Sequence, residues 1–180
     1  MIYAYIGGGI VLVLGLLVSV MYAIGKSLPL DHVVGATLHV NKPEEEVFAL
    51  IRDIGAWGTW DKGITKMVPL DPVNGRARVR MHMGRNSFVL TLTKEHAPSV
   101  LSLEAVDDQK FFEGRWDYHL SREGSGTKIK LTEYGKVLPA IPRAMLKFAG
   151  DPAMYLKRHL KQIATHFGET PRITDARRIS

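Results

Sequence analysis

The chain has 180 residues, with 24 basic and 18 acidic side chains and a formal charge of +6. This length allows one domain of ordinary size and a short appendage. The many aliphatic and aromatic residues exclude a disordered chain. The absence of Cys excludes disulfides, thiol nucleophiles and Cys-ligated metal or iron–sulfur sites. None of the first 25 residues is charged, so an apolar leader precedes a charged globular part.

Residues 1–25 predict a transmembrane helix. They comprise five Gly, one Ser and otherwise only residues of the apolar class. As a helix they would extend about 37 Å, which exceeds the roughly 30 Å of a hydrocarbon core. A cleaved signal peptide is the alternative, with Ala23-Ile24-Gly25 as a loose cleavage site. It is disfavoured because no Lys or Arg precedes the apolar run and the run is long. A buried core helix is the third interpretation, and its long charge-free sequence would be unusual.

The flanking charges give the expected orientation of this helix. Lys26 and Lys42 follow it and no basic residue precedes it, so the positive-inside bias predicts a cytoplasmic globular domain. Gly15, Ser19 and Ala23 recur every four residues, a spacing at which two membrane helices can pack closely. This stripe predicts helix–helix association, although Gly is also simply common in membrane helices.

Residues 26–32 are expected to be a linker, and residues 33–168 the globular domain. Alternation predicts a strand at 36–40. Asn41 and Glu44 resemble a capping box, with Pro43 in the first turn of a helix. Trp57 and Trp60, three residues apart, indicate a second short helical turn.

From about residue 62 the period changes to two, which predicts about six antiparallel strands joined by short turns. The clearest strand is 76–83, where apolar side chains alternate with Arg76, Arg78, Arg80 and His82. A helical stripe follows, and it keeps its phase across Gly150-Asp151-Pro152, which favours one kinked helix on one surface. The stripe consists of Ile141, Met145, Phe148, Ala149, Leu156, Leu160, Ile163, Ala164 and Phe167. Residues 169–180 are expected to be a flexible polar tail.

This order predicts an α+β fold in which a curved antiparallel sheet wraps around a long C-terminal helix. The chain resembles the helix-grip superfamily, which includes START lipid-transfer domains and polyketide cyclase/dehydrase-like proteins. The resemblance lies in residues 39–67 (HVNKPEEEVFALIRDIGAWGTWDKGITKM), residues 126–135 (GTKIKLTEYG) and the terminal helix, and it covers about residues 33–168. It implies a fold but does not choose among carriers, cyclases, hydrolases, quinone-binding proteins and co-chaperones.

Strand alternation and helix phase select the side chains expected to face the space between sheet and helix. Met and aromatic residues there would suit a hydrophobic ligand, and the alternative is a core filled by these same side chains. The candidate ligand-binding residues are Trp60, Met81, Met83, Leu90, Leu103, Phe112, Trp116, Tyr118, Glu133, Met145 and Phe148.

Glu133 shares the inward face with Ile129 and Leu131. A buried carboxylate must be paired, hydrogen-bonded or protonated, so Glu133 is a candidate polar anchor or general acid/base. The alternative is a rim residue paired with a basic side chain. The alternation on its strand also predicts that Tyr118 points inward. Its hydroxyl could then lie beside a ligand, or the whole side chain could be part of the core.

An enzyme would need several convergent polar groups. Among the polar side chains, only Glu133 and Tyr118 are clearly expected to point inward. His82 and His119 are expected on the outward face, and His159 and His166 off the helical stripe. No metal or cofactor motif is evident, and we expect no nucleic-acid partner because the outward Arg76, Arg78, Arg80, Lys128 and Lys130 lack interleaved aromatics.

The sequence therefore predicts a membrane-anchored protein that binds a lipid, isoprenoid or quinone-like molecule, with binding favoured over catalysis. A cyclase- or dehydratase-like enzyme using Glu133, with Tyr118, is one alternative. An accessory subunit of a membrane complex is the other.

Overall fold

The computed structural model describes residues 2–148, 151 and 153–176, and within these ranges the side chains of residues 8–174. The chain divides into two compact units, which we describe separately. The helical unit comprises residues 1–30 and 137–152, and the sheet unit comprises residues 31–136 and 153–180.

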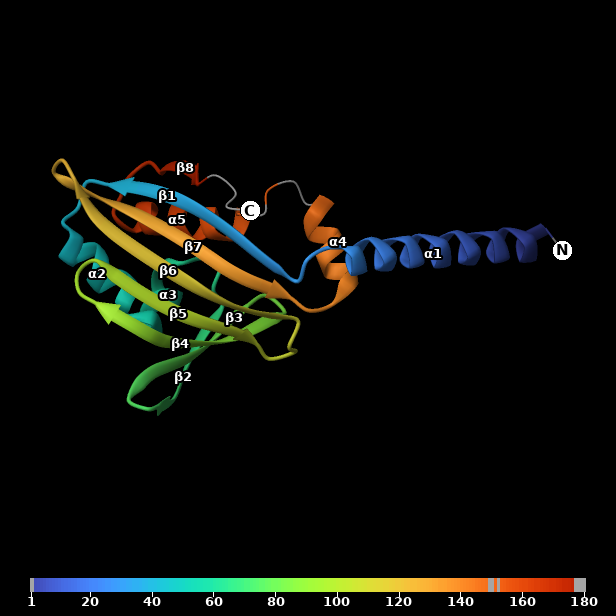
Figure 1. Cartoon of the computed structure of the whole chain (residues 1–180), viewed down its shortest axis with the longest axis horizontal. Coiled ribbons are helices and arrows are strands. Elements are labelled where there is room, and N and C mark those ends of the chain that lie inside the picture. Colours follow the sequence, from blue (N-terminus) through green and yellow to red (C-terminus); the bar gives the residue numbers. More distant parts are fainter. Residues whose placement is uncertain (1, 149–150, 152, 177–180) are drawn as a thin grey trace. The chain divides into compact units, whose positions relative to one another are not determined.

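The described residues form one eight-stranded antiparallel sheet in the order β2-β3-β4-β5-β6-β7-β1-β8 (Figure 1). Six consecutive strands follow the first helices, as predicted, and β1 closes the meander by pairing with β7. The strands are β1 (Asp31–Val40), β2 (Lys66–Val73), β3 (Arg76–Met83), β4 (Asn86–His96), β5 (Val100–Asp107), β6 (Phe112–Glu123), β7 (Gly126–Val137) and β8 (Arg172–Ala176).

The two faces of the sheet differ in burial, because successive side chains of a strand point to opposite faces. On β7, Ile129, Leu131 and Glu133 are buried, while Lys128 and Lys130 between them are exposed. The same alternation follows β3, β5 and β6. We call the face that carries Leu131 the inner face. The predicted inward side chains of the strands, including Glu133, do lie on it.

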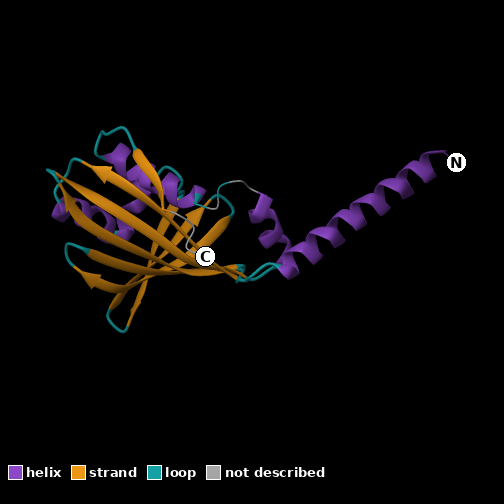
Figure 2. Cartoon of the chain, turned by 45° about the horizontal axis from the view of Figure 1, so that its top comes forward, coloured by secondary structure: helices purple, strands orange, loops and turns teal. Residues whose placement is uncertain are grey.

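Short helices and one longer helix lie on the inner face (Figure 2). They are α2 (Glu44–Arg52), a 3-10 turn (Ile54–Ala56), α3 (Trp57–Trp60) and α5 (Met154–His166). Leu156, Leu160 and Ile163 of α5 are fully buried in the core. Trp57, also fully buried, donates its indole Nε1–H to the carbonyl of Ile51 at 3.0 Å, which fixes α3 to the end of α2.

The predicted capping box at the start of α2 is wrong. The N-cap residue is Pro43, and no side chain caps the helix. The backbone and side-chain N–H groups of Asn41 instead donate to the Glu169 carboxylate, at 2.9 to 3.1 Å. Asn41 therefore binds Glu169, which is 128 residues away in the sequence, and does not cap α2.

Three predicted boundaries also differ from the structure. The first helix continues to Ser27 and β1 begins at Asp31, so the linker is shorter than residues 26–32. Part of the expected tail forms β8, which pairs with β1 from Gly35 to His39.

The kinked terminal helix is in fact two helices, α4 (Ala140–Phe148) and α5, which belong to different units. Of the residues assigned to its stripe and kink, Ala149, Gly150 and Pro152 lie outside the described residues.

The helical unit consists of α1 (Ile2–Ser27) and α4. Among the described residues, Gly8–Ser27 forms one helix long and apolar enough to cross a membrane, with few of its side chains buried. Gly15, Ser19 and Ala23 are exposed on it, and their role in helix association stays a prediction. The Ser19 hydroxyl donates to the carbonyl of Gly15 at 2.8 Å.

Replacing Leu160 by Ala tests the packing of α5 on the inner face. This side chain is fully buried, so its truncation should lower the free energy of unfolding by about 2–5 kcal/mol. Chemical denaturation of the full chain measures the change. Lys161→Ala, at the exposed neighbouring position, is the control and should shift stability by less than about 0.5 kcal/mol. Equal effects of the two variants would contradict this packing.

Candidate functional site

Helix length limits how much of the inner face α5 can cover. It has 13 residues, about 20 Å of helix, whereas β6 and β7 have 12 residues each, about 40 Å of strand. The inner face accordingly has a fully packed part and a half-buried part. Among the predicted pocket residues, Met81, Leu90, Leu103 and Tyr118 are buried in the packed part, so this part is a filled core.

The half-buried part is built from aromatic rings. His32, Phe88, Phe112 and Trp116 are each partly exposed, and we call these four residues the aromatic rim. The Phe112 ring centroid lies 6.2 Å from that of Phe88 and 6.3 Å from that of His32. Met83, also partly exposed, ends β3 two residues beyond the buried Met81. Of the predicted set, Met83, Phe112 and Trp116 therefore remain accessible to a ligand.

Two glycines make room for these rings. A Cβ at Gly135 would lie 2.4 Å from the His32 ring and 2.9 Å from the Phe112 ring. A Cβ at Gly114 would lie 2.8 Å from the same Phe112 ring and 2.9 Å from the carbonyl oxygen of Tyr134. Real Cβ contacts are not this short, so glycine at both positions lets the two rings lie against the strands.

Glu133 lies at the aromatic rim and is only 8 % exposed. The indole Nε1–H of Trp116 donates to its Oε2 at 2.7 Å, and the Nε2 of His32 lies 2.9 Å from its Oε1. Both carboxylate oxygens therefore have a partner, which a buried carboxylate requires. The predicted alternative of a pairing with Lys or Arg is not what the structure shows, because a histidine and a tryptophan take that place.

A second polar network lies in the packed core. The Asp61 Oδ2 is 2.8 Å from the Nδ1 of His159, whose Nε2 is 3.1 Å from the Tyr118 hydroxyl. Since a carboxylate only accepts, the imidazole donates from Nδ1, and in its neutral form it accepts the phenol proton at Nε2. Asp61, Tyr118 and His159 are all buried, so this chain of hydrogen bonds has no direct access to solvent.

Sequence reasoning missed Asp61 and His159, and it placed His159 off the helical stripe. The structure corrects this, because His159 is buried on the same face of α5 as Leu156, Leu160 and Ile163. Spacings of three, four and seven residues from Leu156 are those of one helix face. The helical period of α5 is therefore the signal that places His159 inward, although its side chain is polar.

Three tryptophans surround the His159 imidazole. Its ring centroid is 4.8 Å from Trp57, 5.3 Å from Trp60 and 5.9 Å from Trp116. Trp116 also stacks on Trp57, with an interplanar angle of 13°. Trp60 is buried within this cluster and does not belong to the aromatic rim. Trp116 is the residue that connects the packed core with Glu133.

The surroundings shift two pKa values in the buried network. Burial acts to raise the pKa of Asp61, but the hydrogen bond and charge of His159, the Gly63 amide and Arg158 together lower it below its usual range. Burial, and then the negative charge of Asp61, raise the pKa of the Tyr118 phenol well above its usual value. At neutral pH the network therefore holds a carboxylate and an intact phenol, an arrangement that orients the imidazole.

Met145 and Phe148 were expected to line the ligand space. They lie on α4, which belongs to the helical unit, and are 60 % and 63 % exposed there, so their place beside a ligand stays a prediction. Within the helical unit, Arg143 binds α4 to the end of α1.

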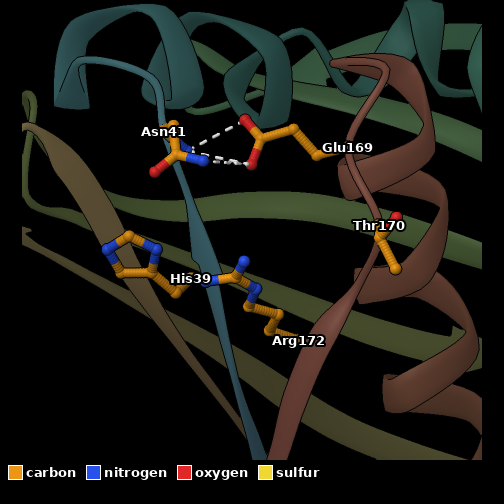
Figure 3. Close-up of a pocket in the computed structure, with 5 residues that line it drawn as sticks. All are labelled: His39, Asn41, Glu169, Thr170 and Arg172. Atoms are coloured by element: carbon orange, nitrogen blue, oxygen red, sulfur yellow. Dashed lines mark hydrogen bonds between the residues drawn. The ribbon is translucent and has the colours of Figure 1, made fainter.

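A separate polar pocket of about 160 Å³ lies beside β1 and β8, and it is lined by His39, Asn41, Glu169, Thr170 and Arg172 (Figure 3). The Asn41–Glu169 hydrogen bonds close one side of it. The described residues contain no group of three or more His, Asp and Glu side chains that could hold a metal ion.

The Asp61–His159 pair should make stability depend on pH. Because the pKa of Asp61 is lowered in the folded chain, its contribution is present above the unfolded value of about 4 and is lost as pH falls through the folded value. Asp61→Asn should lower the free energy of unfolding by about 1–3 kcal/mol at neutral pH. The difference from the unchanged chain should shrink below about pH 4.

Denaturant titrations across pH measure this difference. Asp71→Asn, at an exposed position on β2, is the matched control and should leave the profile unaltered. A difference for Asp61→Asn that stays constant down to acid pH would contradict the role given to its charge.

Comparisons with known proteins agree with this architecture. Similar solved structures include the ZhuI aromatase/cyclase from Streptomyces, with a TM-score of 0.63 and 14% identity over 76% of this chain and 93% of that one. A START superfamily protein from Mycobacterium smegmatis has a TM-score of 0.60 and 18% identity over 76% and 99%. A protein from Thermus thermophilus has a TM-score of 0.59 and 18% identity over 74% and 94%. At these identities the likeness concerns the fold alone.

No curated protein sequence matches the chain. The profile of one protein family, described as polyketide cyclase / dehydrase and lipid transport, matches residues 31–167. These residues include strands β1 to β7 and the helices from α2 to the end of α5, and they leave out β8. The helix-grip fold and the extent of this match establish that the chain belongs to the polyketide cyclase/dehydrase and lipid transport family.

Proposed function

We propose that the protein is a membrane-anchored binding protein for a hydrophobic small molecule with one polar end, such as a lipid, isoprenoid or quinone-like compound. The observation that carries this proposal is the aromatic rim with Glu133 at its base. There the inner face presents partly exposed rings and a carboxylate whose position is fixed by His32 and Trp116.

The apolar surface of the rim supplies the driving force for binding. Phe88 and Phe112 of the rim, together with Met83, pack against the core and are partly exposed. Covering such surface with an apolar ligand contributes about 25 cal/mol per Å². His32 is the polar group best placed to meet the ligand, because 30% of its side chain is exposed while its Nε2 is held by Glu133.

The membrane anchor is α1. Its apolar length suits a bilayer, and water-insoluble ligands of this class reside in that phase. Lys26 at its end and Lys42 beyond it favour a cytoplasmic sheet unit.

Replacing Phe112 by Glu tests the binding site. The charge should exclude an apolar ligand from the rim, so that the amount of one apolar compound recovered with the purified full-length protein falls at least about tenfold, equivalent to 1.4 kcal/mol. Mass spectrometry of organic extracts measures it.

The matched control for this variant is Val106→Glu, an exposed apolar position on the outer alternation of β5. It carries the same charge change and the same α1, so lipid that merely surrounds α1 is equal in both samples. Circular dichroism confirms that both variants fold. Identical extracts from the two folded variants would contradict binding at the rim.

An enzyme is the second candidate function, and the His32–Glu133 pair favours it. The two groups are 2.9 Å apart and His32 is partly exposed, so a proton could pass between them and a bound substrate. The family description includes cyclases and dehydrases, and a carboxylate that exchanges a proton through His32 would serve such chemistry.

Glu133→Gln separates the two functions. Gln keeps an oxygen that can accept from Trp116 but cannot take up a proton. If Glu133 only orients a ligand, the co-purified compound should remain at a similar level. If Glu133 is a general acid or base, turnover of that compound should cease although binding persists, and unaltered turnover would exclude the catalytic role.

A further inference from the structure

The proposed function does not use the exposed apolar side chains of α4. Met145 and Phe148 are largely exposed, and Leu146 and the preceding Leu138 are exposed as well. With the half-buried Ile141, Met145 and Phe148 form a stripe at spacings of four and three residues on one side of the helix. The side of the helix next to this stripe carries Ala140, Arg143 and Ala144, which are buried.

This buried side holds α4 against the end of α1. A Cβ at Gly25 would lie 1.8 Å from the carbonyl oxygen of Ala140, so the two backbones touch at a position where only glycine fits. The Arg143 Nε–H donates to the carbonyl of Gly25 at 3.0 Å, and its Nη1 donates to the carbonyls of Val137 and Leu138 at 2.8 and 2.6 Å. The Gly25 carbonyl also accepts from the Leu28 N–H at 3.3 Å, so the guanidinium is its second donor and ties the last turn of α1 to α4.

The contact fixes where α4 lies along the axis of α1. The apolar span runs from Gly8 to Ser27, and Gly25 is in its last turn. A helix fastened at Gly25 is therefore at the end of the span, where hydrocarbon gives way to headgroups. The basic residues Lys26 and Lys147 belong to the same unit, and they suit anionic headgroups at that depth.

We propose that α4 is an interfacial helix whose Ile141–Met145–Phe148 stripe inserts into the headgroup–acyl boundary of the bilayer that α1 crosses. This rests on the proposed anchoring by α1 and adds a second membrane contact to it. The occupant of the stripe is lipid, because the attachment at Gly25 and Arg143 holds the stripe beside the end of the span.

Single cysteines carrying an environment-sensitive fluorophore test this proposal, because the chain has no Cys of its own. The full-length variants Met145→Cys and Phe148→Cys are labelled and reconstituted in vesicles of phosphatidylcholine with phosphatidylglycerol. Lipids with a nitroxide near the headgroup or near the chain end then quench the fluorophore according to its depth. Leu14→Cys, in the middle of α1, and Val106→Cys, an exposed apolar position of the sheet unit, are the reference positions.

The expected result is that labels at residues 145 and 148 lose most fluorescence with the shallow nitroxide, while the Leu14→Cys label loses most with the deep one. The Val106→Cys label should lose little with either. If the Leu14→Cys label is quenched from the chain end but those on α4 are not quenched, the anchor stands and the interfacial helix is overturned. A blue-shifted but unquenched label on α4 would place the stripe against protein and would also overturn it. Absence of quenching at every position would refute the anchor and, with it, this inference.

Discussion

The mismatch in length between α5 and the strands beneath it is the constraint from which the rest of the sheet unit follows. About 20 Å of helix cannot cover about 40 Å of strand. Where α5 covers the inner face, leucines and isoleucines fill the space between helix and sheet. The partly exposed part of the inner face carries aromatic rings instead, and Gly114 and Gly135 make room for those of His32 and Phe112. The candidate binding surface is therefore the part of an otherwise ordinary core that its own helix leaves half-covered.

The polar side chains that the site needs in this apolar interior form two hydrogen-bonded networks, whereas the buried Nε1–H of Trp60 has no hydrogen-bond partner among the described residues. Asp61, His159 and Tyr118 form one chain of hydrogen bonds, and His32, Glu133 and Trp116 form another. Removing one member of such a network leaves its partner buried and unsatisfied, which costs more than the bond itself contributes. Trp116 lies between the two networks: its indole N–H donates to Glu133, and its ring centroid is 5.9 Å from that of His159. A ligand that contacts Trp116 would thus touch a residue that is in contact with both networks.

The sequence was sufficient for features governed by local periodicity and insufficient for those that depend on distant partners. Alternation along 76–83 and 128–135 placed these two strands and their inward side chains, Glu133 among them. The partners of Glu133 could not be derived, because His32 is 101 residues away in the chain. Asn41 is a second example, because it binds the distant Glu169 and does not cap the helix as expected. The short polar strand β8 is a third, because it forms only by pairing with β1. The phase of the last stripe suggested one helix, but phase cannot reveal that Arg143 fastens its first part to α1.

Photocrosslinking at the aromatic rim tests the central claim most directly. With p-benzoyl-phenylalanine in place of Phe112, the full-length chain is irradiated in the cells that produce it and the modified peptide is identified by mass spectrometry. The account predicts an adduct between residue 112 and an apolar molecule that is not protein, and loss of this adduct when the same probe replaces the outward Val106. Crosslinks only to other residues of the chain would contradict it, because they would mean that side chains already fill the rim.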